Sequence, residues 1–345
     1  MEIENKVCLC TPQMDRMRRR ELFVDLLRFT AILLVTAFHV ARWLGYENLT
    51  FLNAVNTVFK EGNYTGVCLF FAISGYCHVK TWREGSRYLH FILGRLARLA
   101  PAYYVAIAIW ACLVSIGIAV KPIGAWHLLS HVFFLHVYSA DTFYSVSGVF
   151  WYLGVLMQFY VLSPLLRRLC ERRVVGWSVV IVSFCVCLVL SKQLHLTNPV
   201  FTRSALFYLP SFMVGMMFAK HPIVIQQRFA KVAVIVLSIV LFFTRIPYCD
   251  GIALQIKPLA LFFGAMQFEG CLHGISQWAW RPVSVVASAS FSIYLYNYIY
   301  LVSRPVLKCG MVFLCYVAFV VGVGIVMYLL VEQPFASFVA RRRES

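Results

Sequence analysis

The stretch LLRFTAILLVTAFH (residues 26–39) decides the fold class, because it is typical of a membrane-spanning helix. A helix that crosses a bilayer needs about 20 apolar residues, and the apolar run around this stretch extends from residue 22 to 44. The run nevertheless contains Arg28 near one end and His39 near the other. A charge near the centre of a bilayer costs several kcal/mol, so these two residues need an explanation.

The spacing of Arg28 and His39 places both side chains on one face of the helix. Eleven residues at about 100° each end about 20° past three full turns, with a rise of roughly 16 Å. Two interpretations stay open at this point. Arg28 can extend to the lipid headgroups while His39 bonds to a neighbouring helix. Alternatively, Arg28 anchors an anionic substrate and His39 serves as a general base.

The composition of the whole chain indicates a polytopic membrane protein. Of its 345 residues, 61% are hydrophobic and only 13% are charged, whereas soluble domains are roughly 45–50% apolar. The net charge of +17 does not indicate nucleic-acid binding, because the basic residues cluster between apolar runs. Most of the 12 cysteines lie inside those runs, where cysteine behaves as a small hydrophobe.

The apolar runs predict ten spans and an all-α polytopic helical bundle. If both termini are cytoplasmic, most of the 31 Lys and Arg residues fall on the inner side, as the positive-inside rule demands. This holds only if the short run WHLLSHVFFLHV (126–137) is re-entrant or interfacial. We expect basic tails at 1–21 and 336–345 around a membrane domain at 22–335. The predicted spans are 22–44, 62–80, 99–119, 149–166, 174–191, 204–219, 232–245, 252–273, 283–302 and 309–331.

Five segments, taken in order, resemble the acyltransferase 3 family of multi-spanning membrane acyltransferases. The first is RFTAILLVTAFH, which is similar to the family's Arg-x10-His signature. The others are LFFAISGY (69–76), GRLARLAPAYYV (94–105), FWYLGVLMQFYVLSPLL (150–166) and YLLVEQPF (328–335). The chain departs from the family pattern where it has Cys68, Leu156, Met157 and Asn297.

The resemblance implies an O-acyltransferase, with acetyl-CoA as the donor and a glycan hydroxyl as the acceptor. Arg28, Arg95 and Arg98 would then hold the phosphate groups of the acyl-CoA, since arginine binds phosphate through two hydrogen bonds and keeps its charge. His39 would deprotonate the acceptor hydroxyl or relay the acyl group. Arg95 and Arg98 can equally act as topology anchors, because they lie at the predicted inner end of the third span.

Three further residues are candidates for supporting roles. Ser74 is either an acyl-carrying nucleophile or part of a Ser-Gly packing site. Glu269 is an acidic residue inside an apolar run, and we expect it to pair with an arginine or with His39. Glu332 matches the family's closing motif, in which Pro334 would mark the end of the last helix.

The sequence predicts no metal site and no bound cofactor. His127, His131 and His136 lie close together in the 126–137 segment, but no carboxylate lies beside them, so interfacial packing is favoured over zinc binding.

The expected function is O-acetylation of a cell-surface polysaccharide or of its lipid-linked precursor. The expected partners are acyl-CoA, the glycan and membrane lipids, but no nucleic acid. The expected location is the plasma membrane, a bacterial inner membrane, crossed several times. The alternative is a transporter or flippase for a lipid-linked glycan, which would use the same buried charges without chemistry.

Overall fold

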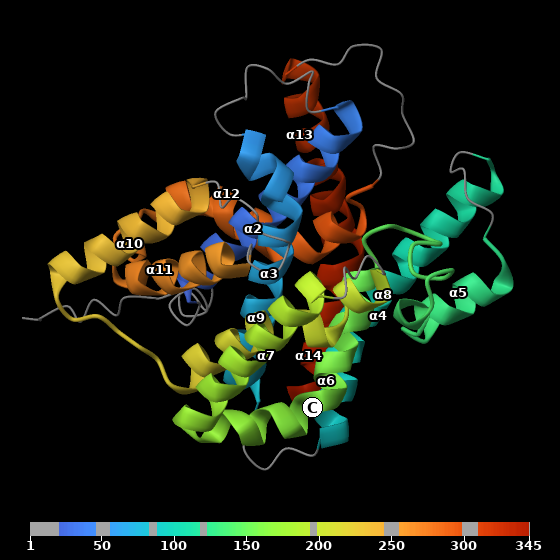
Figure 1. Ribbon diagram of the computed structural model, residues 1–345. Coiled ribbons are helices and arrows are strands. Elements are labelled where there is room, and N and C mark those ends of the chain that lie inside the picture. Colours follow the sequence, from blue (N-terminus) through green and yellow to red (C-terminus); the bar gives the residue numbers. More distant parts are fainter. Residues whose placement is uncertain are drawn as a thin grey trace, which may run out of the picture.

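The computed structural model describes residues 21–45, 56–82, 88–117, 123–193, 199–244, 255–298 and 310–344. These residues form helices and turns with no strand, which confirms the all-α fold class (Figure 1). Except for Glu21, the predicted N-terminal tail lies outside them. The helices are α2 (Leu22–Leu44), α3 (Asn56–Thr81), α4 (Tyr88–Ser115), α5 (Ala125–Val132), α6 (Trp151–Glu171), α7 (Arg173–Gln193), α8 (Pro199–Thr202), α9 (Ala205–Lys220), α10 (Arg228–Phe243), α11 (Ile256–Leu272), α12 (Gln277–Leu295), α13 (Gly310–Met327) and α14 (Gln333–Glu344).

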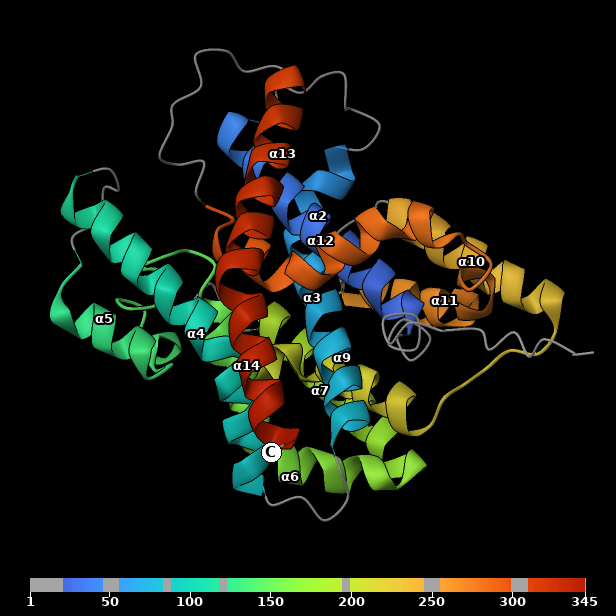
Figure 2. The same ribbon diagram turned by 180° about the vertical axis from the view of Figure 1, so that it is seen from behind.

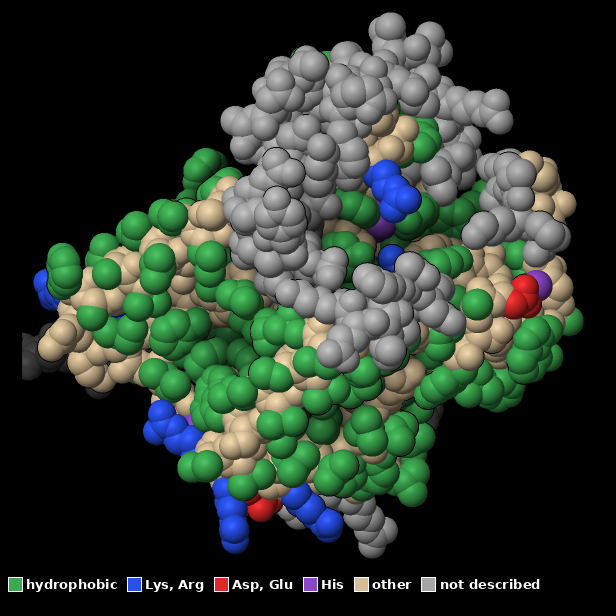
Figure 3. Space-filling view, in the orientation of Figure 1, with side chains coloured by type: hydrophobic (Ala, Val, Ile, Leu, Met, Phe, Trp, Pro, Cys, Tyr) green, Lys and Arg blue, Asp and Glu red, His purple; other side chains and the backbone are tan. Residues whose placement is uncertain are grey.

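Six segments of the described residues are helical, long and apolar enough to cross a membrane. They are Leu22–Leu44, Tyr88–Ser115, Trp151–Glu171, Arg173–Leu190, Val200–Lys220 and Gly310–Phe338. Each of the ten predicted spans coincides with a helix, but the full count of ten crossings stays a prediction. On the face shown in Figure 3, apolar side chains dominate, and several Lys and Arg side chains gather at the lower edge. This distribution is that of a membrane protein.

Helix α2 lies at the centre of the bundle, where it packs against α3, α11, α12 and α13 (Figures 1 and 2). One side of α2 is packed with small and branched side chains, including Ala31, Ile32, Val35 and Val40, which are fully buried. Because helices in a bilayer associate through close packing, this contact surface holds α2 in place among its neighbours. The polar side chains of α2 therefore have fixed surroundings.

Helices α3 and α9 cross closely at a pair of glycines. A Cβ atom on Gly75 would collide with the backbone of Phe212, and one on Gly215 would collide with the backbone of Ala72. Small residues at such crossings let two backbones approach, as is common between membrane helices. Gly75 thus faces α9, while the preceding residue Ser74 points to a different side of α3.

The histidine-rich segment does not form a helix long enough to cross the bilayer. Its helix α5 has 8 residues, or about 12 Å, and a short 3₁₀ turn follows at His136–Tyr138. The segment packs beside α4, where the Tyr104 hydroxyl donates a hydrogen bond to the carbonyl oxygen of Val132 (3.1 Å). Its predicted interfacial position stays a prediction.

The last helical rod contains a π-helical segment, Tyr328–Glu332, between α13 and α14. The prediction that Pro334 ends the helix is wrong, because α14 continues to Glu344. Proline is tolerated at the start of a helix, where its missing N–H would have no partner within that helix. The predicted C-terminal tail, 336–345, is therefore helical up to Glu344 (Figure 2).

Candidate functional site

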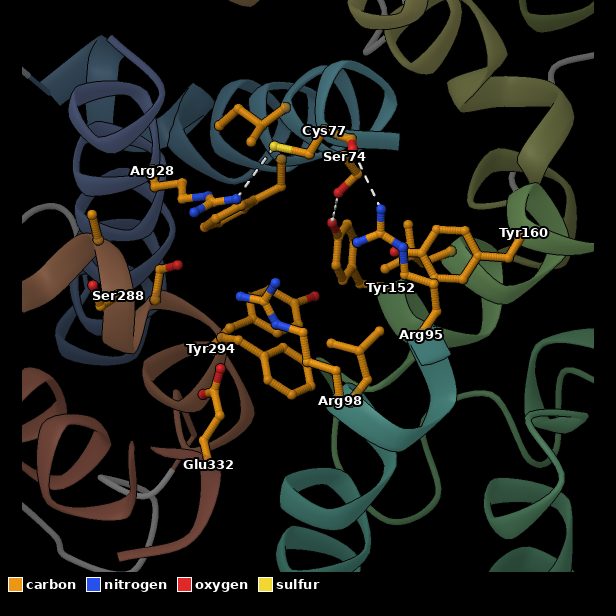
Figure 4. A pocket seen from close by; sticks show the side chains of 17 residues that line it. Arg28, Ser74, Cys77, Arg95, Arg98, Tyr152, Tyr160, Ser288, Tyr294 and Glu332 are labelled. Atoms are coloured by element: carbon orange, nitrogen blue, oxygen red, sulfur yellow. Dashed lines mark hydrogen bonds between the residues drawn. The ribbon is translucent and has the colours of Figure 1, made fainter. Parts of the chain in front are cut away.

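A cavity of about 120 Å³ lies among α2, α3, α4, α6, α12 and the π-helical segment (Figure 4). It gathers five of the predicted site residues, which come from distant parts of the sequence. Those five are Arg28, Ser74, Arg95, Arg98 and Glu332, and the remaining lining residues are Phe70, Ile73, Cys77, Leu99, Tyr152, Leu156, Tyr160, Ala287, Ser288, Ser290, Phe291 and Tyr294.

Three arginines from two helices point into this space (Figure 4). Arg28 projects from α2 and donates a hydrogen bond to the Sγ atom of Cys77 (3.4 Å). Arg95 projects from α4, donates to the backbone carbonyl of Cys77 (3.3 Å) and contacts the Thr81 hydroxyl. Arg98 follows one turn later on α4 and retains an exposed side chain. The cavity is therefore strongly cationic.

Aromatic rings fix the position of Arg95. Its guanidinium carbon lies 5.1 Å from the centroid of the Phe91 ring and 5.8 Å from that of the Tyr160 ring. A cation over an aromatic face is stabilised by about 0.5–1 kcal/mol at exposed sites, and more where water is excluded. These contacts hold the charge at the cavity wall.

Among the described residues that line the cavity, Glu332 supplies the one carboxylate beside the arginines. Its side chain is only 6% exposed, and its Oε2 atom accepts a hydrogen bond from the Ser292 hydroxyl (2.8 Å). Glu332 is the last residue of the π-helical segment, and such segments inside α-helices often occur at functional sites. The wider turn alters the side-chain direction that a regular α-helix would give this residue.

The Ser74 hydroxyl pairs with a tyrosine on the cavity wall. Its Oγ atom lies 3.1 Å from the hydroxyl oxygen of Tyr152, at hydrogen-bond distance. No histidine or carboxylate among the described residues is recorded as a partner of Ser74, so nothing in this part of the chain is placed to deprotonate it. The geometry favours a role for Ser74 in the wall.

Three rings close one end of the cavity. The Tyr152 and Tyr294 ring centroids lie 5.3 Å apart, and Phe70 lies 6.1 Å and 6.2 Å from them. We call Phe70, Tyr152 and Tyr294 the aromatic end of the cavity. Along α3, Phe70 precedes Ser74 and Cys77, so this end lies nearest the half of α2 that carries His39.

His39 does not line the cavity, although it lies on the same helix as Arg28, α2. It packs against Tyr298, just past the end of α12, with ring centroids 4.7 Å apart, and its side chain is 7% exposed. Tyr294, one turn earlier, lines the cavity. The cavity and His39 thus contact neighbouring parts of the same segment, Tyr294 and Tyr298. This agrees with the predicted position of Arg28 and His39 on one face of α2.

Glu269 lies outside the cavity and contacts the beginning of α2. Its two carboxylate oxygens accept hydrogen bonds from the backbone N–H groups of Leu22 (2.9 Å) and Phe23 (2.6 Å). It also pairs with His273, at 3.2 Å. The described residues therefore pair Glu269 with a helix N-terminus and a histidine of its own helix instead of with an arginine or His39.

The three histidines of the 126–137 segment make separate contacts. His127 pairs with Asp141 (3.1 Å), and the Nε2 atom of His136 donates to the carbonyl of Phe150 (3.1 Å). The rings of His131 and His136 stack, with centroids 4.1 Å apart. Within the described ranges, no three His, Cys, Asp or Glu side chains gather as metal ligands would.

Sequence reasoning missed several residues of the cavity. Cys77 carries no motif, and Ser288 and Ser290 lie in an apolar helix. Tyr152 falls inside one of the family-like segments, and Tyr294 belongs to the series of tyrosines at 294, 296, 298 and 300. The tyrosines at every second position of this series were the signal available in the sequence. Their spacing does not tell which tyrosine faces the cavity.

The family comparison covers most of the chain. The model of the acyltransferase 3 family, described as an acyltransferase domain, matches residues 21–331. That range contains every helix that lines the cavity and ends within the π-helical segment, one residue before Glu332.

Two curated relatives match shorter parts. A Caenorhabditis elegans protein, "Regulator of hypoxia-inducible factor 1", is 27% identical over 174 residues, which are 43% of this chain and 34% of that protein. "Nodulation protein 10" of Rhizobium leguminosarum bv. viciae is 29% identical over 192 residues, 50% of this chain and 52% of that protein. The chain thus matches between a third and about half of the length of these relatives. No solved structure matches.

Proposed function

This chain belongs to the acyltransferase 3 family, and from that premise we propose that it transfers an acetyl group from acetyl-CoA to a glycan hydroxyl. The acceptor is a cell-surface polysaccharide or its lipid-linked precursor. The observation that carries the proposal is the convergence of Arg28, Arg95 and Arg98 on one cavity beside His39. A membrane acyltransferase needs a site for an anionic donor and a base near that site. Helix α2 carries a candidate for each, Arg28 for donor binding and His39 as the base.

The charge of the cavity supports an acyl-CoA donor. Three guanidinium groups face one carboxylate, so an anion with two charges would balance the site. Arginine binds phosphate oxygens through two parallel hydrogen bonds, and coenzyme A carries its phosphates at the end opposite the thioester. A cavity of about 120 Å³ holds one part of the donor. In the proposal, the phosphates bind the arginines while the pantetheine arm extends toward His39.

The aromatic end of the cavity supports a short acyl group. Phe70, Tyr152 and Tyr294 line the cavity together with the arginines, with ring centroids 5.3–6.2 Å apart. In the proposal, the acyl group passes these rings on its way to His39. A slender acetyl thioester passes such a constriction more easily than a longer chain, because filling packed space costs about 1–3 kcal/mol. We therefore favour acetyl over larger acyl groups.

The proposed chemistry requires one base, His39. Its imidazole accepts the proton of the acceptor hydroxyl as the hydroxyl oxygen attacks the thioester carbonyl carbon. The carbon–sulfur bond breaks, and the imidazolium returns the proton to the departing thiolate of coenzyme A. Base catalysis by a positioned histidine contributes about 10²–10⁴ in rate. Arg28 holds the donor on the cytoplasmic side of His39, and Ser74 and Glu332 support the cavity wall.

The proposed setting is the plasma membrane, a bacterial inner membrane, with both termini in the cytoplasm. Acetyl-CoA then reaches the arginines from the cytoplasmic side. The predicted split of Lys and Arg residues and the basic lower edge in Figure 3 support this orientation.

The experiment is acetyl transfer by the purified protein in lipid nanodiscs. Radiolabelled acetyl-CoA is supplied with surface glycans from cells that lack the gene, and both thiol release and labelled glycan are measured. We expect glycan labelling by the wild type and not by His39→Gln. A wild-type protein that moves a lipid-linked glycan across the membrane and leaves acetyl-CoA intact would replace the proposal with a flippase.

A further inference from the structure

A second basic group lies beside His39, outside the cavity of the donor arginines. Arg203 lies between α8 and α9, and its guanidinium carbon is 5.2 Å from the Tyr144 ring centroid and 5.4 Å from that of Trp151. Among the described residues, none accepts a hydrogen bond from the Arg203 guanidinium or forms an ion pair with it. A partly buried guanidinium held by rings and without an acceptor is unusual, because it has five N–H donors to satisfy.

Arg203 belongs to the surroundings of His39. Its charge acts electrostatically on His39 and on Tyr298, the ring that packs against His39. The loop that carries Tyr144 also approaches Tyr298, since a Cβ atom on Gly148 would lie 3.2 Å from the Tyr298 ring. Arg203, its ring contacts Tyr144 and Trp151, and Tyr298 beside His39 thus form one continuous group, which we call the Arg203 group.

A second cation approaches His39 from its own helix. Arg42 follows His39 by three residues on α2, hence on a neighbouring face one turn later, and its charge acts on both His39 and Tyr298. Its side chain is exposed. None of the ion pairs among the described residues supplies a carboxylate to Arg42 or Arg203. Among the described residues, the surroundings of His39 therefore carry two positive charges, Arg42 and Arg203.

The position of this group relates it to the reaction. Trp151, which contacts Arg203, directly precedes Tyr152 of the aromatic end of the cavity. Tyr298, which contacts His39, lies one turn beyond Tyr294 of that same end. The Arg203 group therefore adjoins the aromatic end of the cavity through Trp151 and adjoins His39 through Tyr298. In the proposed reaction, the acceptor approaches His39 from this side. The face shown in Figure 3 is hollowed in its upper half, and Lys or Arg and His side chains are visible there.

We propose that Arg203, with Arg42, binds an acidic group on the acceptor sugar, so that the acceptor is an anionic glycan. This inference rests on the proposed function, because it assigns the second substrate of the same reaction. The guanidinium provides a planar fork for a carboxylate or phosphate oxygen pair. Tyr144, Trp151 and Tyr298 provide flat faces on which a sugar ring packs. A neutral lipid or a neutral glycan would leave both guanidinium groups without a partner.

The experiment measures sugar binding to the full-length protein in nanodiscs of neutral phosphatidylcholine, with coenzyme A present in saturating amounts to fill the donor cavity. One pair of probes is methyl glucuronide and the uncharged methyl glucoside, which tests a carboxylate. The other pair is glucose 1-phosphate and glucose, which tests a phosphate, and inorganic phosphate is the control for anion binding without a sugar. Dissociation constants are measured by calorimetry for the wild type, Arg203→Gln, Arg203→Lys and Arg228→Gln.

The expected result is that at least one charged probe binds about tenfold or more tightly than its neutral partner, which corresponds to about 1.4 kcal/mol. Arg203→Gln abolishes that preference, Arg203→Lys keeps part of it, and Arg228→Gln, an exposed arginine at the start of α10, keeps all of it. The fold of each variant is checked by its thermal unfolding in the same nanodiscs.

Two results would overturn the inference. The first is equal binding of charged and neutral sugars by the wild type. The second is binding of inorganic phosphate as tight as that of the charged sugars, since this indicates an adventitious ion only. Failure of the proposed function has a different signature: the wild type binds the charged sugar with the Arg203-dependent preference but neither binds coenzyme A nor cleaves acetyl-CoA.

Discussion

Tyr294 and Tyr298 lie four residues apart, and the first lines the arginine cavity while the second packs against His39 at 4.7 Å. Tyr294 belongs to the last turn of α12, and Tyr298 lies in the turn that follows the helix, so this short segment joins the cavity wall to the contact of the proposed base. In the proposed reaction the acyl group passes the rings around Tyr294, so the first prediction concerns them.

Replacing Phe70 by alanine should widen the acyl-group selectivity. The change removes one of the three rings at the aromatic end, and the space left admits a longer chain. We expect the ratio of kcat/KM for butyryl-CoA to that for acetyl-CoA to rise about tenfold, in line with the 1–3 kcal/mol that packing restrictions impose. Phe243→Ala, an exposed phenylalanine on α10, is the matched control. An unchanged ratio would place the limit on acyl length elsewhere.

Replacing His39 by glutamine should reduce acetyl transfer by about 10²–10⁴, the loss typical of a missing general base. Glutamine keeps hydrogen bonding but cannot accept the proton. Membrane insertion should persist, because the change adds no charge to the span. Initial rates and the amount of protein in the membrane fraction are measured together. If most of the wild-type rate remains, His39 is a packing residue and the general base is a different group.

Replacing Arg95 and Arg98 together by glutamine should weaken coenzyme A binding at least tenfold. Each lost charge-assisted hydrogen bond is worth about 1.5–3 kcal/mol. Calorimetric titration with coenzyme A reports the change directly, and Arg281→Gln, an exposed arginine on α12, serves as the control. Equal affinities of the double variant and the wild type would reduce both arginines to topology anchors.

Replacing Glu332 by glutamine should tighten coenzyme A binding, because it removes the one carboxylate from a cationic cavity. Even at the dielectric constant of water, two unit charges about 4 Å apart interact by about 1 kcal/mol, or about fivefold in affinity. Glutamine can still accept the hydrogen bond from Ser292, so the π-helical segment keeps that contact. Weaker binding would instead assign Glu332 to positioning the arginines.

Replacing Glu269 by alanine should lower stability by about 1 kcal/mol and leave the KM for the donor unchanged. No side chain at the N-cap position of α2 bonds to its first turn, and Glu269 supplies that contact from α11. Loss of a helix N-cap typically costs about 0.5–2 kcal/mol. Thermal unfolding in detergent compares Glu269→Ala with Glu171→Ala, which lies exposed at the end of α6. A change in donor KM would return Glu269 to the list of site residues.

The sequence predicted which helices exist far better than how their side chains meet. Each of the ten predicted spans overlaps a helix among the described residues, because apolar runs of such length have few alternatives in a membrane. Five of the seven predicted site residues line one cavity, since buried charges in such helices face the interior of a bundle. Spacing along α2 also placed Arg28 and His39 on one face.

The remaining features depend on contacts between distant segments, which no local pattern encodes. Glu269 bonds to a helix that begins 247 residues earlier in the chain. Arg203 lies in a short connection between apolar runs, where the positive-inside rule counts it as a topology charge. Pro334 seemed to end a helix because the rule for the residue before proline assumes regular α-helical geometry, and the preceding turn is π-helical.

The π-helical segment also sets the angular phase of everything that follows it. A π turn holds one residue more than an α turn, so removing one residue from 328–332 would restore a regular helix and turn the downstream residues by about 100°. Glu332 would then leave the cavity although its chemistry is unchanged. Insertion or loss of one apolar residue in this segment would therefore rotate Glu332 relative to the cavity. The charge of the site would change without any substitution in it.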